Sequence, residues 1–268
     1  MSFYGSEFIF DGKSCKEYGL TLYNFGSASQ GDVSFPSVGK VFEDRILSRY
    51  SSLFYGISQN DSLEYTLVFG ANTDSLDRNE HLDRTEISAI ASWLTGHGEQ
   101  KWLQIVQEDM DAFRFKCIIS DLKLLTYGSL PWAFSCTVYC DSPFAYTFPE
   151  VYSYHVNETA EIIFLNKSTY NGYYKPKIKI SNISDRSFSI VNLTDGERSF
   201  SFSNLPSSVS SITIDNESMI ISDDNGDLNL YPYFNYNFLR LKRGDNQLRL
   251  IGTADVEFIC EFPVNIGG

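Results

Sequence analysis

The feature that most constrains the fold of this chain is a two-residue alternation of apolar and polar side chains in its second half. Near the C-terminus, Val256, Phe258 and Cys260 alternate with polar residues such as Glu257. Because successive side chains of a β-strand point to opposite faces, this pattern predicts a strand with one buried face. The same alternation recurs at residues 177–180, 212–214 and 247–250. No helical period follows residue 149, so the second half is expected to be a β-sandwich or jelly roll.

A hairpin is predicted at Asn225-Gly226, which follows the apolar run Met219–Ile221. Asn-Gly is favoured in two-residue hairpin turns, where both positions adopt a positive φ. The acidic stretch Asp223–Asp227 also hints at a calcium-binding loop. Its glycine is misplaced for an EF-hand and no Glu stands at the twelfth position. A hairpin turn is therefore the favoured interpretation, and no metal is expected.

The first half of the chain is predicted to be β structure interrupted by one α-helix. Asp83 and Glu86 are spaced as a capping box, and Gly96 is placed to end the helix. Between them, the apolar residues of one helical face recur at Ile87, Ile90, Ala91 and Leu94. A first strand is expected within residues 7–13, where it runs into a turn at Asp11-Gly12. Further strands are expected at residues 20–23, 62–69, 113–119 and 132–140. The apolar face of the helix is expected to pack on the core rather than to bind a cofactor.

Two domains are expected, one at residues 1–145 and one at residues 146–268. Pro143 and Pro149 flank the segment between them and make it the best candidate for the boundary. Within the first domain, residues 26–39 are rich in Gly and Ser. This composition is typical of a long loop or an extended arm.

The five cysteines are expected to be free thiols, because no secretory signal opens the chain. Cys136 and Cys140 lie on one alternating segment, which would hold their Cα atoms about 13 Å apart. A disulfide needs less than about 7 Å. Both residues, like Cys117 and Cys260, lie on apolar strand faces and should be buried. Cys15 lies in a turn-like segment and is expected to be the most accessible thiol.

Charge and motifs disfavour several classes of function. The net charge of −13 argues against a nucleic-acid-binding surface. No apolar stretch is long enough to cross a bilayer. His81, His97 and His155 are far apart and match no metal-binding spacing. The sequence has no nucleophile elbow, phosphate-binding glycine loop or Cys-x-x-Cys pair. We therefore expect a soluble protein made in a cytoplasm, with no catalytic activity, metal or cofactor.

Near the two ends of the chain lie the segments Phe8–Leu20 and Phe238–Asn246. Both resemble segments of a known family, the siphophage distal tail proteins (Dit), within the phage tail component family. Phe8–Leu20 resembles their first strand, their Gly-x-Ser turn and the Phe/Tyr-Gly-Leu that opens their second strand. Towards the other end, Ser211–Asp215, Gly226–Leu228 and Phe238–Asn246 follow the order and spacing of the family. Leu239 stands where the family usually has a proline, which loosens a local turn and leaves the register intact. The resemblance runs along nearly the whole chain, including the capped helix.

The resemblance implies a mainly β structural protein of the virion. Its N-terminal β domain would carry one α-helix and an extended arm, and its C-terminal domain would be a galectin-like β-sandwich. Six copies would form a ring in the baseplate hub, which joins the tail tube to the host-adhesion apparatus and surrounds the DNA channel. The other partners would be the tail tube protein, the tail-associated hub protein and receptor-binding or other baseplate proteins. DNA would pass without specific binding and no membrane would be contacted. Such a protein is made and assembled in the cytoplasm of the bacterial host and resides at the tail tip of the virion.

Two segments are candidate interaction surfaces. The first is the densest aromatic cluster of the chain, residues 231–238, which has more rings than one strand face can bury. The second directly follows the Gly/Ser-rich segment 26–39 and suits an arm that contacts the next subunit. The candidate residues are Tyr231, Tyr233, Phe234, Tyr236, Val41, Phe42 and Arg45.

The alternative function is a carbohydrate-binding module that contacts the host cell wall. Exposed Tyr beside Asn suits a sugar platform as well as a protein interface, where Tyr is enriched. A cell-wall hydrolase is the third hypothesis, since acidic residues are plentiful, although no pair of carboxylates stands out. Formation of a closed ring would favour the structural hypothesis, and sugar affinity of the purified protein would favour the second.

Overall fold

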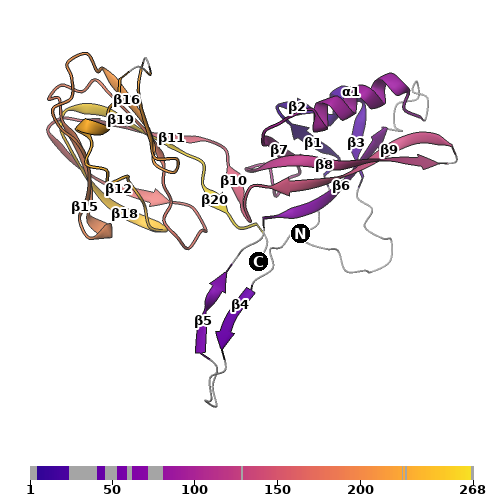
Figure 1. The fold of residues 1–268 in the computed structure, drawn as a ribbon, viewed down its shortest axis with the longest axis horizontal. Coiled ribbons are helices and arrows are strands. Elements are labelled where there is room, and N and C mark those ends of the chain that lie inside the picture. Colours follow the sequence, from indigo (N-terminus) through magenta and orange to yellow (C-terminus); the bar gives the residue numbers. More distant parts are fainter. Residues whose placement is uncertain are drawn as a thin grey trace. The chain divides into compact units, whose positions relative to one another are not determined.

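The computed structural model describes residues 5–23, 41–45, 53–58, 62–71, 81–127, 129–224, 226 and 228–266. These residues are mainly strand, and α1 (Arg84–Thr95) is the one α-helix among them (Figure 1). The expected mainly β fold is therefore confirmed. The chain forms two compact units: unit 1 comprises Met1–Tyr146 and Asn265–Gly268, and unit 2 comprises Thr147–Val264.

Unit 1 is built on an antiparallel sheet with the order β2-β1-β7-β8-β9-β6-β3, to which β10 adds by pairing with β8. Its strands are β1 (Glu7–Phe10), β2 (Lys13–Ser14), β3 (Leu20–Leu22), β6 (Glu64–Ala71), β7 (Lys101–Val106), β8 (Phe113–Tyr127), β9 (Leu130–Cys140) and β10 (Ala145–Thr147). The backbone N–H of Leu22 donates to the carbonyl of Ser6 at 2.9 Å. This bond joins β3 to the residue before β1, so the sheet curls around its core.

The turn predicted after the first strand is confirmed. Asp11 and Gly12 have φ values of 50° and 76°, and Phe10 pairs with Lys13 across them. This is the geometry of a two-residue hairpin, in which both turn positions adopt a positive φ. The turn places β2 beside β1 and brings the chain to η1 (Cys15–Tyr18), a short 3₁₀ helix.

The expectation that Cys15 is accessible is wrong. Ser14 caps η1 by accepting a hydrogen bond from the N–H of Lys16, and Cys15 is completely buried in the core of unit 1. The backbone N–H of Phe8 donates a hydrogen bond to the Sγ of Cys15 at 3.4 Å. The capped turn directs this side chain inwards, which a composition typical of turns could not reveal. Burial raises the pKa of the Cys15 thiol.

Helix α1 begins and ends where the sequence predicts. The N–H of Glu86 donates to Asp83 at 2.8 Å, and the N–H of Asp83 donates to Glu86 at 3.0 Å, which completes the capping box. The N–H of Gly96 donates to the carbonyl of Ser92 at the other end. Ile90 and Leu94 are buried and Ile87 packs against the core, so the predicted apolar face is confirmed.

Trp93, which the helical pattern did not single out, also anchors α1 in the core. Its ring stacks between Tyr18 and Phe8, with centroids 4.5 and 5.7 Å away. Its Nε1–H donates to the carbonyl of Phe10 at 3.1 Å. Aromatic burial of this size dominates local packing energy, and the hydrogen bond satisfies the one polar atom of the side chain.

The core of unit 1 also contains the predicted cysteine-bearing strand faces. Phe115, Cys117 and Ile119 of β8 are buried, and Cys136 and Cys140 of β9 are buried beside them. All five cysteines of the chain are free and buried. Burial raises the pKa of Cys136 and of Cys140 to about 12, so both behave as small hydrophobic residues.

A separate hairpin in unit 1 consists of β4 (Val41–Arg45) and β5 (Leu53–Ser58). These strands pair antiparallel with each other, with an irregularity between Glu43 and Asp44, and with no other described strand (Figure 1). An isolated two-stranded hairpin is at best marginally stable in water. The Gly/Ser-rich segment 26–39 lies outside the described residues.

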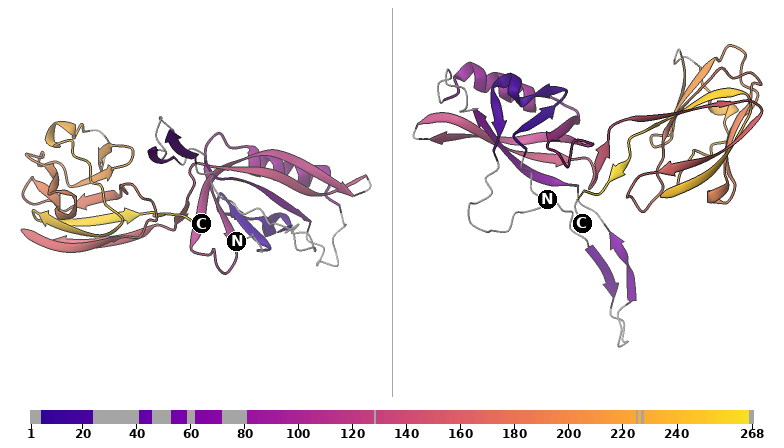
Figure 2. Two further views of the ribbon diagram at one scale, coloured as in Figure 1. Left: turned by 90° about the horizontal axis from the view of Figure 1, so that it is seen from below. Right: turned by 180° about the vertical axis from the view of Figure 1, so that it is seen from behind.

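Unit 2 is a sandwich of two antiparallel sheets, seen as two layers in Figure 2. One has the order β11-β19-β13-β16-β17: β11 (Glu150–Val156), β19 (Ala254–Cys260), β13 (Lys177–Ser181), β16 (Ser211–Asp215) and β17 (Ile220–Asp223). The other has the order β12-β18-β14-β15: β12 (Thr159–Asn166), β18 (Gly244–Ile251), β14 (Phe188–Asn192) and β15 (Arg198–Phe202). Alternate residues of both sheets, such as Ile178, Phe258, Ile190 and Leu248, meet in one core. The predicted β-sandwich is confirmed. Two short 3₁₀ helices, η2 (Leu193–Asp195) and η3 (Tyr231–Tyr233), and β20 (Pro263–Val264) complete the unit.

The hairpin predicted at Asn225-Gly226 is wrong. β17 pairs with β16 around residues 216–219, and no described strand pairs with it across Gly226. A turn does form, because Gly226 has a φ of 74° and its N–H donates to the carbonyl of Asp223 at 3.1 Å. The chain that leaves this turn runs irregularly through η3 to β18, since it closes the sandwich rather than extending a sheet.

Candidate interaction surfaces

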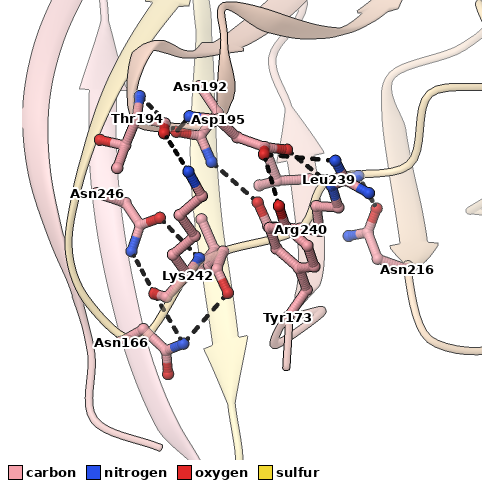
Figure 3. A network of polar contacts seen from close by, with 11 residues as sticks. Asn166, Tyr173, Asn192, Thr194, Asp195, Asn216, Leu239, Arg240, Lys242 and Asn246 are labelled. Atoms are coloured by element: carbon pink, nitrogen blue, oxygen red, sulfur yellow. Dashed lines mark hydrogen bonds and ion pairs between the residues drawn. The ribbon is translucent and has the colours of Figure 1, made fainter. Parts of the chain in front are cut away.

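The segment between β17 and β18 carries most of the candidate surface, and buried asparagines hold its C-terminal part in place. Residues 239–242 belong to no β-strand, so their backbone N–H and C=O groups need hydrogen-bond partners outside a strand ladder. Tyr174 supplies two of them, because its N–H and carbonyl bond the carbonyl and N–H of Leu241 at 2.9 and 2.7 Å. Side-chain amides supply the others (Figure 3).

Four asparagines, each almost completely buried, bond this backbone. Asn216 accepts from the N–H of Leu239 at 2.8 Å and donates to the carbonyl of Pro176. Asn192 donates to the carbonyl of Arg240 at 2.9 Å. The N–H of Lys242 donates to the side-chain oxygen of Asn246, and the side-chain amide of Asn246 donates to the carbonyl of Lys242. The side-chain amide of Asn166 donates to the same carbonyl at 3.0 Å. We call Asn166, Asn192, Asn216 and Asn246 the asparagine clamp.

The clamp presents Arg240 to a polar site on the surface of the sandwich. The Nε of Arg240 donates to Asp195 at 2.7 Å, and the guanidinium carbon of Arg240 lies 4.0 Å from the centroid of the Tyr173 ring. The hydroxyl of Tyr173 donates to the same carboxylate at 3.0 Å. Burial raises the pKa of Asp195, but the hydrogen bonds from Arg240 and Tyr173 outweigh it and hold the pKa below its usual range. This arrangement orients Arg240 and fixes the charge of Asp195 at neutral pH.

The predicted aromatic cluster is divided between core and surface. Phe234 is buried against Phe200 and Phe202, with ring centroids 5.1 and 5.0 Å away. Tyr236 is 64% exposed, and its ring lies 6.3 Å from that of Tyr231 in a stacked arrangement. The structure thus brings Tyr231, Phe234 and Tyr236 together, with Phe234 as the anchor and Tyr236 as the exposed ring.

Tyr236 also has a strained backbone, with a φ of 61°. A bulky residue is an outlier in the left-handed region and usually marks a turn or a functional constraint. Met219 shares both properties, with a φ of 58° and 53% of its surface exposed. The hydroxyl of Tyr231 donates to the carbonyl of Met219 at 2.7 Å. Met219 therefore extends the exposed patch, and nothing in the alternation of the sequence distinguished it.

The remaining candidate residues are Tyr233 and the three residues of the arm, Val41, Phe42 and Arg45. Tyr233 is half-buried, and its carbonyl accepts from the N–H of Ser203 at 2.9 Å. Val41, Phe42 and Arg45 lie on β4, in the hairpin of unit 1. Their role as an interaction surface stays a prediction.

The described residues contain no group of three or more His, Cys, Asp or Glu side chains that could hold a metal ion. Within the same parts of the chain, no helix has the length and apolar character needed to span a membrane. His97 bonds the carbonyl of Trp93 at 2.8 Å, and His155 bonds Asp255 at 2.6 Å. Asp224, in the stretch that hinted at a calcium loop, accepts a hydrogen bond from Ser210 at 2.8 Å. These groups therefore have structural partners within the chain.

A curled sheet that carries one helix, followed by a sandwich with an exposed aromatic patch, defines a mainly β protein of two units. Two family models match this chain: the phage tail protein N-terminal domain over residues 3–142, and the phage tail C-terminal domain over residues 144–260. The chain belongs to this phage tail protein family. No curated protein matches the sequence significantly.

Solved structures of phage proteins share the fold. The crystal structure of the SPP1 Dit (gp 19.1) protein, described as a paradigm of the hub adsorption apparatus in phages that infect Gram-positive bacteria, matches with a TM-score of 0.65 and 13% identity, over 96% of this chain and 98% of that one. A chain of the phage P2 baseplate in its activated conformation with calcium matches with a TM-score of 0.56 and 11% identity, over 93% and 92% of the two chains. The same baseplate with strontium gives a TM-score of 0.55 and 12% identity, over 95% and 97%. The chain thus belongs to a phage tail protein family, and its fold resembles that of SPP1 Dit.

Proposed function

We propose that this chain is the distal tail protein of a siphophage, a structural subunit of the baseplate hub without catalytic activity. The observation that carries the proposal is that both halves of the chain match phage tail domains in the expected order. The likeness in fold to SPP1 Dit also extends over 96% of the chain. Its partners would be other tail and baseplate proteins, and its location would be the tail tip of the virion.

Six copies would form a ring through unit 1, around a channel for DNA. Identical subunits joined head to tail close into a ring when the rotation between them permits. The hairpin of β4 and β5 supports this assembly, because a two-stranded hairpin gains stability from a further strand or surface. Val41, Phe42 and Arg45 would lie in this arm, in contact with the next subunit. The net charge of −13 suits a channel that lets DNA slide without holding it.

Unit 2 would be the galectin-like domain that contacts neighbouring baseplate proteins. The exposed patch of Met219, Tyr231 and Tyr236 suits such a contact, because Tyr and Met are enriched in protein interfaces.

Native mass spectrometry and negative-stain microscopy of the purified protein test the ring. We expect a six-subunit ring, and Phe42→Asp should reduce its yield while Glu43→Asp leaves it intact. A chain that stays monomeric at its highest soluble concentration, both alone and with the tail tube protein, would contradict the proposal.

Carbohydrate binding is the second candidate function for unit 2. It is favoured by the stacked arrangement of Tyr231 with the exposed ring of Tyr236, since aromatic faces can serve as platforms for sugars. The double variant Tyr233→Ala/Tyr236→Ala distinguishes the two roles. Weakened assembly with unchanged adsorption to host cell walls supports a protein interface. Loss of binding to wall polysaccharide with normal assembly and stability supports the lectin function.

A further inference from the structure

In the sheet β12-β18-β14-β15 of unit 2, the two edge strands β15 and β12 differ in how their free backbone groups are covered. On β15, the N–H of Ser201 donates to the Asn235 side chain at 3.2 Å, and the N–H of Asn235 donates to the carbonyl of Ser201 at 3.1 Å. The side-chain amide of Asn235 also donates to the carbonyl of Ser199 at 2.8 Å. Asn235 thus takes the place of a neighbouring strand and protects this edge from pairing with another chain.

β12 is the edge at the other end of the same sheet, and its only described neighbour is β18. One position before the ladder begins, the N–H of Gly252 donates to the carbonyl of Glu158 at 2.8 Å. Because inward and outward backbone groups alternate along an antiparallel strand, this bond sets the phase of the ladder. Even-numbered residues of β12 face β18. The N–H and C=O groups of Glu161, Ile163 and Leu165 therefore point towards the open edge.

The side chains at the same odd positions form an apolar surface with charged ends. Ile163 is 68% exposed and Leu165 is 50% exposed, whereas Phe164 between them is buried. Glu161 and Lys167 are also exposed and flank the apolar pair. A long, open edge strand with large exposed apolar side chains is a surface that favours association with another strand.

We propose that β12 is a self-association edge, at which two copies of the chain pair their β12 strands antiparallel about a twofold axis at Phe164. This register places Ile163 opposite Leu165 of the partner subunit and Glu161 opposite Lys167 of the partner subunit, each pair occurring twice. All these positions are odd, so the outward backbone groups of the two strands meet. A contact about a twofold axis must be self-complementary, and this one is.

Neighbouring registers are less complementary. A shift of two residues in one direction places Glu161 opposite Leu165, and a shift in the other direction places Ile163 opposite Lys167. Both shifts set a charge against an apolar side chain. In the proposed register, the charges extend the ion pairs that each copy already contains, Glu161 with Arg249 and Lys167 with Glu150. Exposed ion pairs contribute little affinity. The charged residues Glu161 and Lys167 therefore select the register. The backbone hydrogen bonds and the contact of Ile163 with Leu165 of the partner subunit hold the strands together.

Cross-linking of the full-length protein tests the register directly. All native cysteines are buried, so an introduced surface cysteine is the reactive one. A mixture of Ile163→Cys and Leu165→Cys proteins should form a disulfide-linked dimer several-fold faster than either protein alone. Only in the mixture are the two thiols directly opposite, within the Cα separation that a disulfide requires. Equal rates in all three samples would overturn the proposed register.

Native mass spectrometry tests the association itself. The parent protein should form assemblies with twice the number of subunits found for Ile163→Lys, whatever the size of the ring. Ser153→Lys, at an exposed position of β11, is the matched control and should behave as the parent does. An unchanged mass for Ile163→Lys, with an unchanged melting temperature, would overturn the proposal. If Ile163→Lys still forms rings that no longer associate through β12, the self-association edge is tested separately from the ring assembly proposed above.

Discussion

Units 1 and 2 both bury large apolar cores, but they close those cores in different ways. Unit 1 covers its sheet with α1, whose backbone hydrogen bonds are internal. Gln107 is the one buried polar side chain among its described residues. Unit 2 closes its sandwich with an irregular segment, and the four asparagines of the clamp are buried around it. The difference follows from the backbone, because a helix satisfies its own polar groups and an irregular segment cannot.

The comparison teaches where each unit is vulnerable. In unit 1, stability depends on how well α1 packs, so loss of aromatic volume should cost most. In unit 2, stability also depends on polar side chains, because removing one clamp amide leaves buried backbone groups unpaired. The two units can be followed separately, since Trp93, Trp102 and Trp132, the three tryptophans of the chain, all lie in unit 1.

The largest effect is expected for Trp93→Ala. The substitution removes the ring stacked between Tyr18 and Phe8 and the hydrogen bond to the carbonyl of Phe10. Loss of a buried aromatic side chain costs about 3–5 kcal/mol of unfolding free energy. Denaturant unfolding followed by the fluorescence of Trp102 and Trp132 measures this loss in unit 1. Trp93→Phe is the control and should cost less, because it keeps an aromatic ring. A loss below about 1 kcal/mol for the alanine variant would show that α1 is not the main closure of unit 1.

The next largest effect is expected for Asn216→Leu in unit 2. The variant keeps most of the volume but orphans the N–H of Leu239 and the carbonyl of Pro176, which Asn216 bonds at 2.8 and 2.6 Å. An unsatisfied buried group costs about 1–3 kcal/mol, so the two together should cost more than the removal of a methyl group from the adjacent core. Hydrogen exchange of unit 2 amides measures the loss, with Asn157→Leu at an exposed turn as the control. If Asn216→Leu is as stable as that control, the clamp does not stabilise the segment.

The third effect is smaller and depends on pH. Because the pKa of Asp195 is lowered in the native state, its pairing stabilises the fold above the unfolded pKa of about 3.9. This contribution is lost as the pH falls through the lower native value. Arg240→Gln should cost about 1 kcal/mol at neutral pH, a value reduced because Arg240 is partly exposed. The difference between parent and variant in unfolding free energy should shrink below pH ~3.9.

Lys177→Gln provides the control for this prediction. Lys177 pairs with Asp215 at 3.4 Å in an exposed position, and such pairs contribute little. A difference for Arg240→Gln that is equally large at neutral and acidic pH would mean that packing on Tyr173, rather than charge, accounts for it.

The sequence predicted the parts of the fold that depend on period and on local turns. The alternation of Val256, Phe258 and Cys260 predicted a strand, and the spacing of Asp83, Glu86 and Gly96 predicted the ends of the helix. Both are local properties of the chain, and both are confirmed. The hairpin at Asn225-Gly226 was wrong because Asn-Gly specifies a turn and does not specify which strand follows it.

The clamp was missed, although the sequence contained a signal for it. Each asparagine of the clamp occupies the next inward-facing position beside a buried apolar residue of a strand. Asn166, Asn192 and Asn216 lie two residues after the buried Phe164, Ile190 and Ile214, and Asn246 lies two residues before the buried Leu248. A polar residue in the buried phase of a strand must find hydrogen-bond partners. The identity of those partners, the backbone of residues 239–242, depends on tertiary structure and could not be predicted from periodicity.

The smallest effect is expected for Asp83→Ala, and it limits how far the comparison between the units extends. Asp83 accepts a hydrogen bond from the N–H of Glu86 in the exposed first turn of α1, and loss of a cap in an exposed turn costs about 0.5 kcal/mol, the lower end of the range for such caps. The residues that attach α1 to the sheet, Ile90, Trp93 and Leu94, lie about two to three turns beyond Asp83. The first turn can therefore fray without releasing them. Hydrogen exchange should show faster exchange at Glu86 and Ile87, whose N–H groups bond Asp83, and unchanged protection at residues 90–94. Asp83→Asn should stay close to the parent because Asn also caps helices well. If Asp83→Ala costs as much as Trp93→Ala, the helix depends on its cap as unit 2 depends on its clamp. Polar side chains would then close both cores, and the contrast between the units would fail.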